Sequence, residues 1–218
     1  RGRMGPDPTD MKSIRILNRI VTWTSEGIEY EADQRHAEII VQQMGLTPTC
    51  RTHETPSTKV DKLDIRNDTG IEELQGLDAT QYRALVARGN FLAQDRSDIR
   101  FAVKELSRRM AKPRVRDIAS LERFARYLAL RPRLVTKYCK QGPLKTVVGW
   151  SDSDWAGCPE TRKSTSGGVI MIGSHVIRTW STTQSVIATS SGEAEFYAMV
   201  KTGSQLLGIK AMLADMGM

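Results

Sequence analysis

Four carboxylates occur at two places where a fold can present acids to a metal ion. Asp152 and Asp154 end the apolar stretch that begins at Val147, and Glu193 and Glu195 open a stretch with helical periodicity. Hard divalent cations such as Mg²⁺ prefer carboxylate oxygens to nitrogen or sulfur ligands. We therefore expect candidate metal ligands in both pairs, held by a strand on one side and a helix on the other.

Spacing distinguishes the expected roles of the two helical acids but not those of the two strand acids. Residues two apart on a helix point about 160° away from each other, so only one of Glu193 and Glu195 can face a sheet. Ser190 and Glu193 have the spacing of a capping box, which predicts a structural role for Glu193 and leaves Glu195 for chemistry. Asp152 and Asp154 share one face of a strand, so either or both can approach a metal there. The alternative interpretation is turn chemistry for the aspartates and ordinary solvated helix surface for Glu195.

Short β-rich runs and one long helix must position these acids. We expect strands at residues 146–151, 168–172 and 176–181, with Gly173-Ser174 joining the last two as a hairpin. Ser190 or Ser191 then begins a long helix with apolar residues at helical spacing. These elements predict a three-stranded antiparallel meander plus a long helix, in an α/β (α+β) chain.

The upstream residues predict a small strand-helix module followed by three helices. The module occupies residues 11–46, and a polar stretch to about residue 70 marks the first boundary. The helices begin near Asp78, at Ser97 and before Ile118, and Pro113 and Pro132 are stop signals. The expected segments are residues 1–70, 71–142 and 143–218.

Positive charge is concentrated in the predicted helices. Residues 96–140 hold fourteen Lys or Arg and four Asp or Glu, a local excess of ten, whereas the whole chain of 218 residues carries +7. Such groups can follow a phosphate backbone through counterion release, or they can form an ordinary solvated helix face. The candidate nucleic-acid-binding residues are Arg108, Arg109, Lys112, Arg114, Arg116, Arg123 and Arg126.

Composition favours a globular protein from a reducing compartment. The three cysteines lie far apart, which matches neither a zinc site nor an even disulfide framework. No apolar run has the roughly 18 residues of a membrane span, and the basic start lacks the apolar stretch of a signal peptide. We expect an intracellular protein, cytoplasmic or nuclear and not secreted, without membrane or small-molecule partners. Trp150, Trp155 and Trp180 are expected in the core.

Four blocks in order resemble the ribonuclease H domain of copia-type retrotransposon Pol polyproteins. They are Gly149 to Gly157, Arg162 to Gly167, Trp180-Ser181 with Gln184, and Ser190 to Ala198. Residues 82–107 resemble the helical connection between polymerase and nuclease in the same polyproteins. Residues 14–56 are similar, more loosely, to the end of the reverse transcriptase region.

The resemblance implies a chemistry and a set of residues. Asp152 and Glu195 match the family's metal ligands, and the structural motif comprises Asp154, Trp155 and Gly157 together with the helix-capping Ser190 and Glu193. The implied reaction is hydrolysis of RNA in an RNA–DNA hybrid by two Mg²⁺ ions about 4 Å apart. The implied partners are the hybrid or a template–primer duplex and the remainder of the Pol polyprotein.

Two departures limit that expectation. The chain has no Asp-Asp pair, so it lacks the family's polymerase centre. The family's nuclease site also uses aspartates on a later strand and helix, which would lie beyond Met218, so we expect a truncated domain with weak metal binding and little cleavage on its own. The alternatives are a nucleic-acid-binding architectural segment and a decayed element without catalysis.

Overall fold

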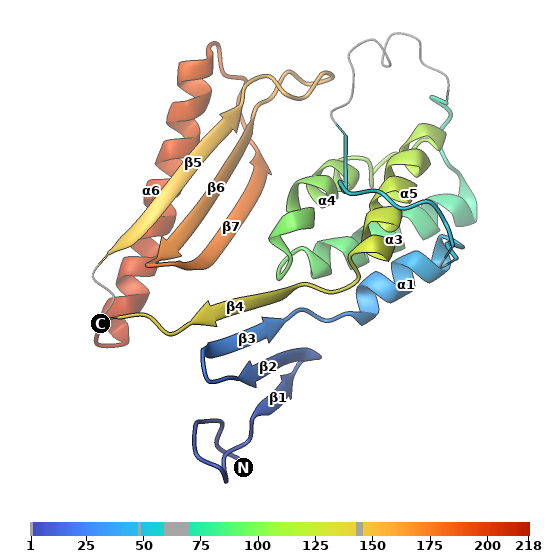
Figure 1. The fold of residues 1–218 in the computed structure, drawn as a ribbon. Helices are drawn as coiled ribbons and strands as arrows, with labels where there is room; N and C mark the ends of the chain where they lie inside the picture. The colour runs from blue at the N-terminus through green and yellow to red at the C-terminus, as the bar shows by residue number, and fades with distance from the viewer. Residues whose placement is uncertain (1, 48, 59–69, 143–145) are drawn as a thin grey trace. The chain divides into compact units, whose positions relative to one another are not determined.

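The computed structural model describes residues 2–47, 49–58, 70–142 and 146–218. They belong to two compact units, Arg1–Tyr138 and Cys139–Met218, each of which combines an antiparallel sheet with α-helices (Figure 1). The mixed α/β class expected from the sequence is therefore confirmed. Within the described ranges, no helix is both long enough and apolar enough to cross a membrane.

The sheet of the first unit has the strand order β1-β2-β3-β4. Its strands are β1 (Ser13–Ile16), β2 (Arg19–Trp23), β3 (Gly27–Glu31) and β4 (Val135–Cys139). Leu17 and Asn18, with φ of 50° and 63°, form the two-residue turn between β1 and β2. Positive φ at both central residues gives the turn a twist that matches the flanking strands. The sequence predicted a strand-helix module in this region, and the structure has three strands there; β4 was not expected.

The helices of the first unit are α1 (Arg35–Gln43), α3 (Gly76–Leu92), the 3₁₀ turn η1 (Ser97–Ile99), α4 (Arg100–Ser107) and α5 (Val115–Leu130). They share one core, which includes Ala37, Ile40, Tyr82, Leu85, Val86, Val103, Leu106, Leu121, Phe124 and Leu128. Each large apolar side chain buried there contributes about 1.5–3 kcal/mol. The three helices expected before residue 142 are confirmed. Because α1 packs with α3 and α5, the core joins residues on both sides of residue 70, and the expected domain boundaries remain predictions.

Charged hydrogen bonds tie the first sheet to the helical part of its unit. The Asp95 carboxylate accepts from Arg19 Nε and from the Tyr30 hydroxyl, both at 2.7 Å. Burial, together with the hydrogen bond to Asp95, raises the pKa of Tyr30 to about 12. Arg133, just before β4, donates from Nε and Nη2 to the two oxygens of Glu31 on β3 at 2.6 and 2.8 Å. The Asp95 contacts join β2 and β3 to the segment after α3, and the Arg133–Glu31 pair joins β3 to the segment that leads into β4.

The second unit is a three-stranded meander covered by one long helix. Its elements are β5 (Val147–Asp154), β6 (Thr165–Ile172), β7 (His175–Thr183) and α6 (Ser191–Asp215), and the strand order is β5-β6-β7. Gly173, with a φ of 58°, begins the expected tight turn between β6 and β7. β5 extends three residues beyond its expected end, so Asp152 and Asp154 both lie within the strand.

Helix α6 covers one face of this sheet (Figure 1). A Cβ atom at Gly149 would lie 2.7 Å from Thr202 Cγ2 and 2.9 Å from Leu206 Cδ1, so β5 and α6 approach closely because this position lacks a side chain. Trp150, on the opposite face of β5, is 63% exposed. The core prediction is therefore confirmed for Trp180, which is 8% exposed, and wrong for Trp150 and Trp155.

Candidate functional site

The two candidate aspartates lie near the carboxyl end of an edge strand. Asp152 is opposite Gly167 and Asp154 is opposite Thr165 in the register between β5 and β6. Both aspartates are exposed. Side chains alternate along a strand, so these two acids share one face of β5, as expected.

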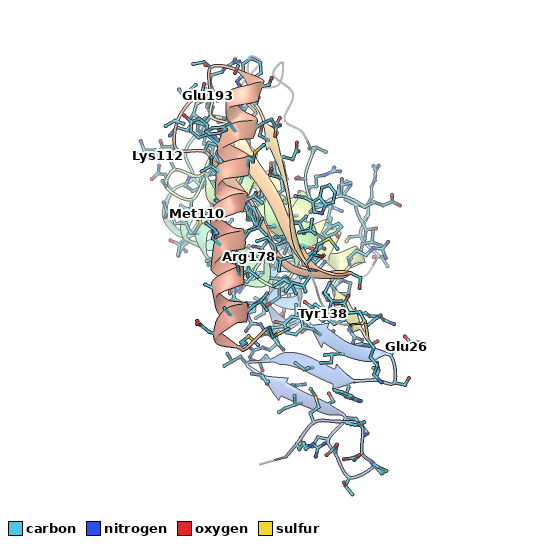
Figure 2. The ribbon with its side chains drawn as sticks, turned by 90° about the vertical axis from the view of Figure 1, so that its left-hand side faces the viewer. Glu26, Met110, Lys112, Tyr138, Arg178 and Glu193 are labelled. Carbon is cyan, nitrogen blue, oxygen red and sulfur yellow. The ribbon has the colours of Figure 1, made fainter. Side chains whose placement is uncertain are left out.

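The first turn of α6 uses Glu193 for capping. Ser190 is the N-cap residue, and its hydroxyl accepts from the Glu193 backbone N–H at 3.1 Å. The Glu193 carboxylate accepts from the backbone N–H of Thr189 at 2.7 Å, from its hydroxyl at 2.6 Å, and from Tyr197 Oη at 3.1 Å. The hydrogen bonds from Thr189 and Tyr197 lower the pKa of Glu193. Figure 2 shows Glu193 at the N-terminal end of the helix, where its carboxylate binds Thr189 and not the Ser190 N–H that a full capping box would use.

Glu195 is the acid of this pair that reaches the sheet. Its Oε1 accepts from the backbone N–H of Ser153 at 3.2 Å and from the Ser153 hydroxyl at 2.9 Å. Sequence reasoning did not identify Ser153, although it stands next to Asp152 in the candidate motif. The carboxylate of Glu195 therefore lies against the main chain of β5 at the residue that follows Asp152.

The two candidate ligands approach β5 from different faces. Ser153 lies on the same face of the strand as Gly149, which packs on α6, whereas Asp152 alternates onto the other face. The structure thus brings Glu195 to Ser153 and places Asp152 one residue away along the strand. The convergence of Asp152 and Glu195 on one cation stays a prediction.

The oxygen ligands available near Asp152 and Glu195 show whether these residues could hold Mg²⁺. Mg²⁺ demands near-octahedral oxygen coordination, and a protein site commonly supplies it with carboxylates and water. In the part of the chain that the structure describes, no group of three or more His, Cys, Asp or Glu side chains could hold a metal ion. Oxygen Oε1 of Glu195 also already accepts two hydrogen bonds. The described residues do not by themselves form a complete magnesium site.

The turn after β5 explains the motif residues Asp154, Trp155 and Gly157. A Cβ at Gly157 would lie 1.9 Å from Asp154 Oδ2, so the aspartate folds over the glycine. The Gly157 N–H also donates to the Asp154 carbonyl at 3.2 Å, and Trp155 Nε1 donates to the Ala188 carbonyl at 3.1 Å. These contacts connect the turn to the segment before α6, which is consistent with a structural role.

Many of the candidate nucleic-acid-binding residues have acidic partners within the first unit. Ion pairs join Arg108 to Glu105 at 3.3 Å, Arg109 to Asp117 at 3.8 Å, Lys112 to Glu73 at 3.6 Å and Arg126 to Glu122 at 2.6 Å. Asp117 also accepts from the Arg114 backbone N–H at 2.8 Å, and the Arg116 backbone N–H donates to the Gly70 carbonyl. Arg123 donates to the Thr55 hydroxyl at 2.8 Å. Among the described residues, four of the seven candidate cations therefore have a carboxylate within 4 Å.

Replacing Ser153 by alanine should destabilise the second unit by about 1–2 kcal/mol, because it removes a hydrogen bond to a carboxylate. The backbone N–H of residue 153 would still bind Glu195, which limits the loss. Urea unfolding of the full chain, followed by hydrogen exchange in β5 and α6, measures the effect. Ser151→Ala, on the same face of β5, is the matched control and should change stability by less than about 0.5 kcal/mol. Equal losses in the two variants would contradict the role of this contact.

The chain is similar to proteins from plant transposons. It is 32% identical over 169 residues to each of two retrovirus-related Pol polyproteins of Arabidopsis thaliana, from transposons RE1 and RE2. The matches cover 78% of this chain and 11% of each polyprotein, so the chain spans about a tenth of the length of these relatives. An uncharacterized mitochondrial protein of the same plant is 28% identical over 172 residues, which are 79% of this chain and 68% of that protein. No protein-family model and no solved structure matches the chain.

Proposed function

Because this chain is a homologue of retrovirus-related Pol polyproteins from transposons, we propose that residues 143–218 are a ribonuclease H-like part of a copia-type polyprotein. In that role they contribute to the metal-dependent hydrolysis of RNA in RNA–DNA hybrids. The observation that carries the proposal is the approach of Glu195, in the first turns of α6, to β5 at the residue after Asp152.

Three features of the second unit support this function. The meander and its covering helix provide a strand and a helix start that each carry an acid. Ser153 orients the carboxylate of Glu195, and Glu193 is engaged in the helix cap, so the two glutamates have separate tasks. The exposed carboxylate of Asp152 remains accessible to a cation or substrate.

The proposed site requires further acids beyond Asp152 and Glu195. Mg²⁺, when bound in a complete set of oxygen ligands, supplies the charge that stabilises phosphoryl transfer. The described residues lack that set, so we propose that Asp152 and Glu195 are part of it. The partners in this proposal are an RNA–DNA hybrid or template–primer duplex and the rest of the polyprotein, in the cytoplasm or nucleus.

Hybrid cleavage tests this proposal in two stages. The chain alone, with a labelled RNA–DNA hybrid and Mg²⁺, should show little or no cleavage above background, and Asp152→Asn should not change it. Robust cleavage that Asp152→Asn abolishes would show that the idea of an incomplete site is wrong.

The second stage uses the full polyprotein that carries this segment. Asp152→Asn and Glu195→Gln should each lower hybrid cleavage by at least about 100-fold, because each removes a charged ligand at the reacting phosphate. Glu193→Gln is the matched control, since it changes an acid of the same helix turn that serves the cap, and it should retain most activity. Full activity in Asp152→Asn would exclude the proposed site.

A second candidate function is a nucleic-acid-binding architectural segment, which the excess of basic residues on the helical region favours. It predicts hybrid binding that weakens with salt, depends on basic side chains and is indifferent to Asp152. A decayed element would neither bind nor cleave.

A further inference from the structure

One basic surface of the first unit is built from two segments distant in the sequence. Residues 51–55 lie along α5, because Arg126 Nη1 donates to the Arg51 carbonyl at 2.7 Å and Arg123 Nη2 donates to the Thr55 hydroxyl at 2.8 Å. The two arginines lie almost one turn apart on the helix and hold both ends of the segment. The imidazole of His53 stands between these two attachment points in the sequence.

The charges around His53 are unequal. Arg51, Arg123 and Arg126 all lower the pKa of the imidazole, whereas Glu122, alone among the described carboxylates, raises it. Glu122 is occupied by Arg126, whose Nε and Nη2 both donate to Glu122 Oε1, at 3.0 and 2.6 Å. Glu54 follows His53 in the sequence and is exposed.

Two of the three guanidinium groups have no carboxylate partner among the described residues. Within the described ranges, Arg51 and Arg123 form no ion pair, and the side chain of Arg51 makes no hydrogen bond. Arg123 uses Nη2 for Thr55, and its buried Nε has no hydrogen-bond partner. A guanidinium group offers five N–H donors in a planar fork that matches the oxygens of a phosphate.

The junction of α4 and α5 is different. Arg108, Arg109 and Lys112 each lie within 4 Å of an acid of the same unit, on Glu105, Asp117 and Glu73. A phosphate that approached them would compete with those carboxylates. Among the described residues, Arg51 and Arg123 have no such carboxylate within 4 Å.

We propose that Arg51, His53 and Arg123 form a phosphate-binding site for the backbone of a nucleic-acid duplex, and that protonation of His53 strengthens it. The inference rests on the proposed nucleic-acid partner and assigns the contact to residues that the charge pattern alone did not identify. Arg51 and Arg123 supply forked donors to phosphate oxygens, and Arg126 fixes the segment. Arg108, Arg109 and Lys112 contribute mainly to the stability of the fold.

The imidazole makes this binding depend on pH. Partial burial and then the charges of Arg123, Arg51 and Arg126 lower the pKa of His53, while Glu122 acts in the opposite direction. The ring is therefore neutral near pH 7. A bound phosphate offsets the arginine charges and favours the protonated ring, so affinity must rise as the pH falls.

The first test compares two double variants that each remove two positive charges. The probe is a 16-base-pair RNA–DNA hybrid in EDTA, titrated at several salt concentrations. Each phosphate contact changes the slope of log K against log salt by about 0.9 and is worth about eightfold at 0.1 M salt. Arg51→Gln with Arg123→Gln should therefore reduce the slope by about 2 and weaken binding by roughly 50-fold.

The matched control is Arg108→Gln with Lys112→Gln, which lowers net charge equally at positions paired with acids and should weaken binding less than about threefold. Thr55→Val keeps every charge while removing the contact to Arg123, and Arg51→Gln alone removes no hydrogen bond of the fold. Circular dichroism confirms folding for each variant. Equal losses in the two double variants would overturn the proposal.

The second test isolates His53. Hybrid affinity of the unmodified chain should rise about fivefold between pH 7.5 and pH 5.5, an increase below the eightfold limit of one full contact. His53→Asn should remove most of that rise. A rise that persists in His53→Asn would refute the role of the imidazole. Binding is measured in EDTA and so does not depend on cleavage. Binding that needs Arg51 and Arg123, without any cleavage in the polyprotein, supports this site and refutes the nuclease. Cleavage in the polyprotein, with binding that does not need Arg51 and Arg123, refutes this site alone.

Discussion

Replacing Arg96 by methionine should destabilise the first unit by about 3–5 kcal/mol, because the change leaves a carboxylate without its buried partner. Arg96 is 1% exposed although it is charged. Its Nη2 and Nε donate to the two Asp98 oxygens at 2.6 and 3.2 Å, and its Nη1 donates to the Arg131 carbonyl at 2.7 Å. Methionine has a similar volume and fills the space, but it donates no hydrogen bond to any of these oxygens.

The position of Arg96 explains why its loss affects the whole unit. It lies just before η1, and its bonds to Arg131 and Pro132 hold the end of α5 to the start of α4. The hydroxyl of Tyr127 on α5 also donates to Asp98 at 2.7 Å, so the same carboxylate joins both elements. Thermal and urea unfolding of the full chain measure the loss. Lys112→Met is the control, because Lys112 is 76% exposed in its ion pair, and it should change stability by less than about 1 kcal/mol.

The cost of Arg96→Met should shrink in acid. Burial raises the pKa of Asp98, but the hydrogen bond and charge of Arg96, with the Tyr127 hydroxyl, outweigh it and hold the pKa below its usual value. A depressed folded-state pKa gives stability that is present above the unfolded value of about 4 and is lost as the pH falls through the folded value. Without Arg96, the stability that comes from the lowered pKa of Asp98 disappears. The difference in unfolding free energy between the unmodified chain and Arg96→Met should therefore narrow from pH 6 to pH 3, and a constant difference would contradict this account.

Local signals predicted the helices well because each helix carries its own boundaries. The α5 helix ends at Leu130, just before Pro132, and Ser190 caps α6 as its spacing with Glu193 predicts. Strand β4 was missed because it is short and contains Lys137, and because its pairing with β3 joins residues about a hundred positions apart. Such a pairing leaves no local signal in the sequence.

The candidate site was predictable in its residues but not in its contacts. Helical rotation and the capping box together identified Glu195 as the acid that reaches the sheet, and the structure agrees. The partner of Glu195 is Ser153. The sequence did not predict this contact, because it depends on how closely α6 approaches β5 at Gly149. Charge counting likewise located the basic helices, but it did not show which cations had carboxylate neighbours. Trp150 was misassigned because sequence patterning does not reveal which sheet face the helix covers.

Replacing Gly168 by alanine should destabilise the second unit by about 3 kcal/mol, because the new methyl group overlaps a buried indole. Gly168 lies opposite Trp180 in the register of β6 and β7. A Cβ there would lie 2.0 Å from Trp180 Cζ2 and 2.4 Å from Cε2, far inside van der Waals contact. The ring is 8% exposed and cannot move without disturbing the packing around it.

The neighbouring Gly167 provides a matched control for Gly168→Ala. At Gly167 the nearest atom to an added Cβ is the Asp152 carbonyl oxygen, 3.9 Å away, so Gly167→Ala meets only ordinary contact. It should be neutral or stabilise the strand by up to about 1 kcal/mol, because alanine loses less backbone entropy than glycine on folding. Urea unfolding and hydrogen exchange in β5 to β7 distinguish the two variants. If steric overlap is the cause, Gly168→Ala should cost much less in a Trp180→Leu background than in the unmodified chain, since the ring that blocks the methyl group is gone. Equal costs in the two backgrounds would mean that backbone conformation, and not the indole, requires glycine at residue 168.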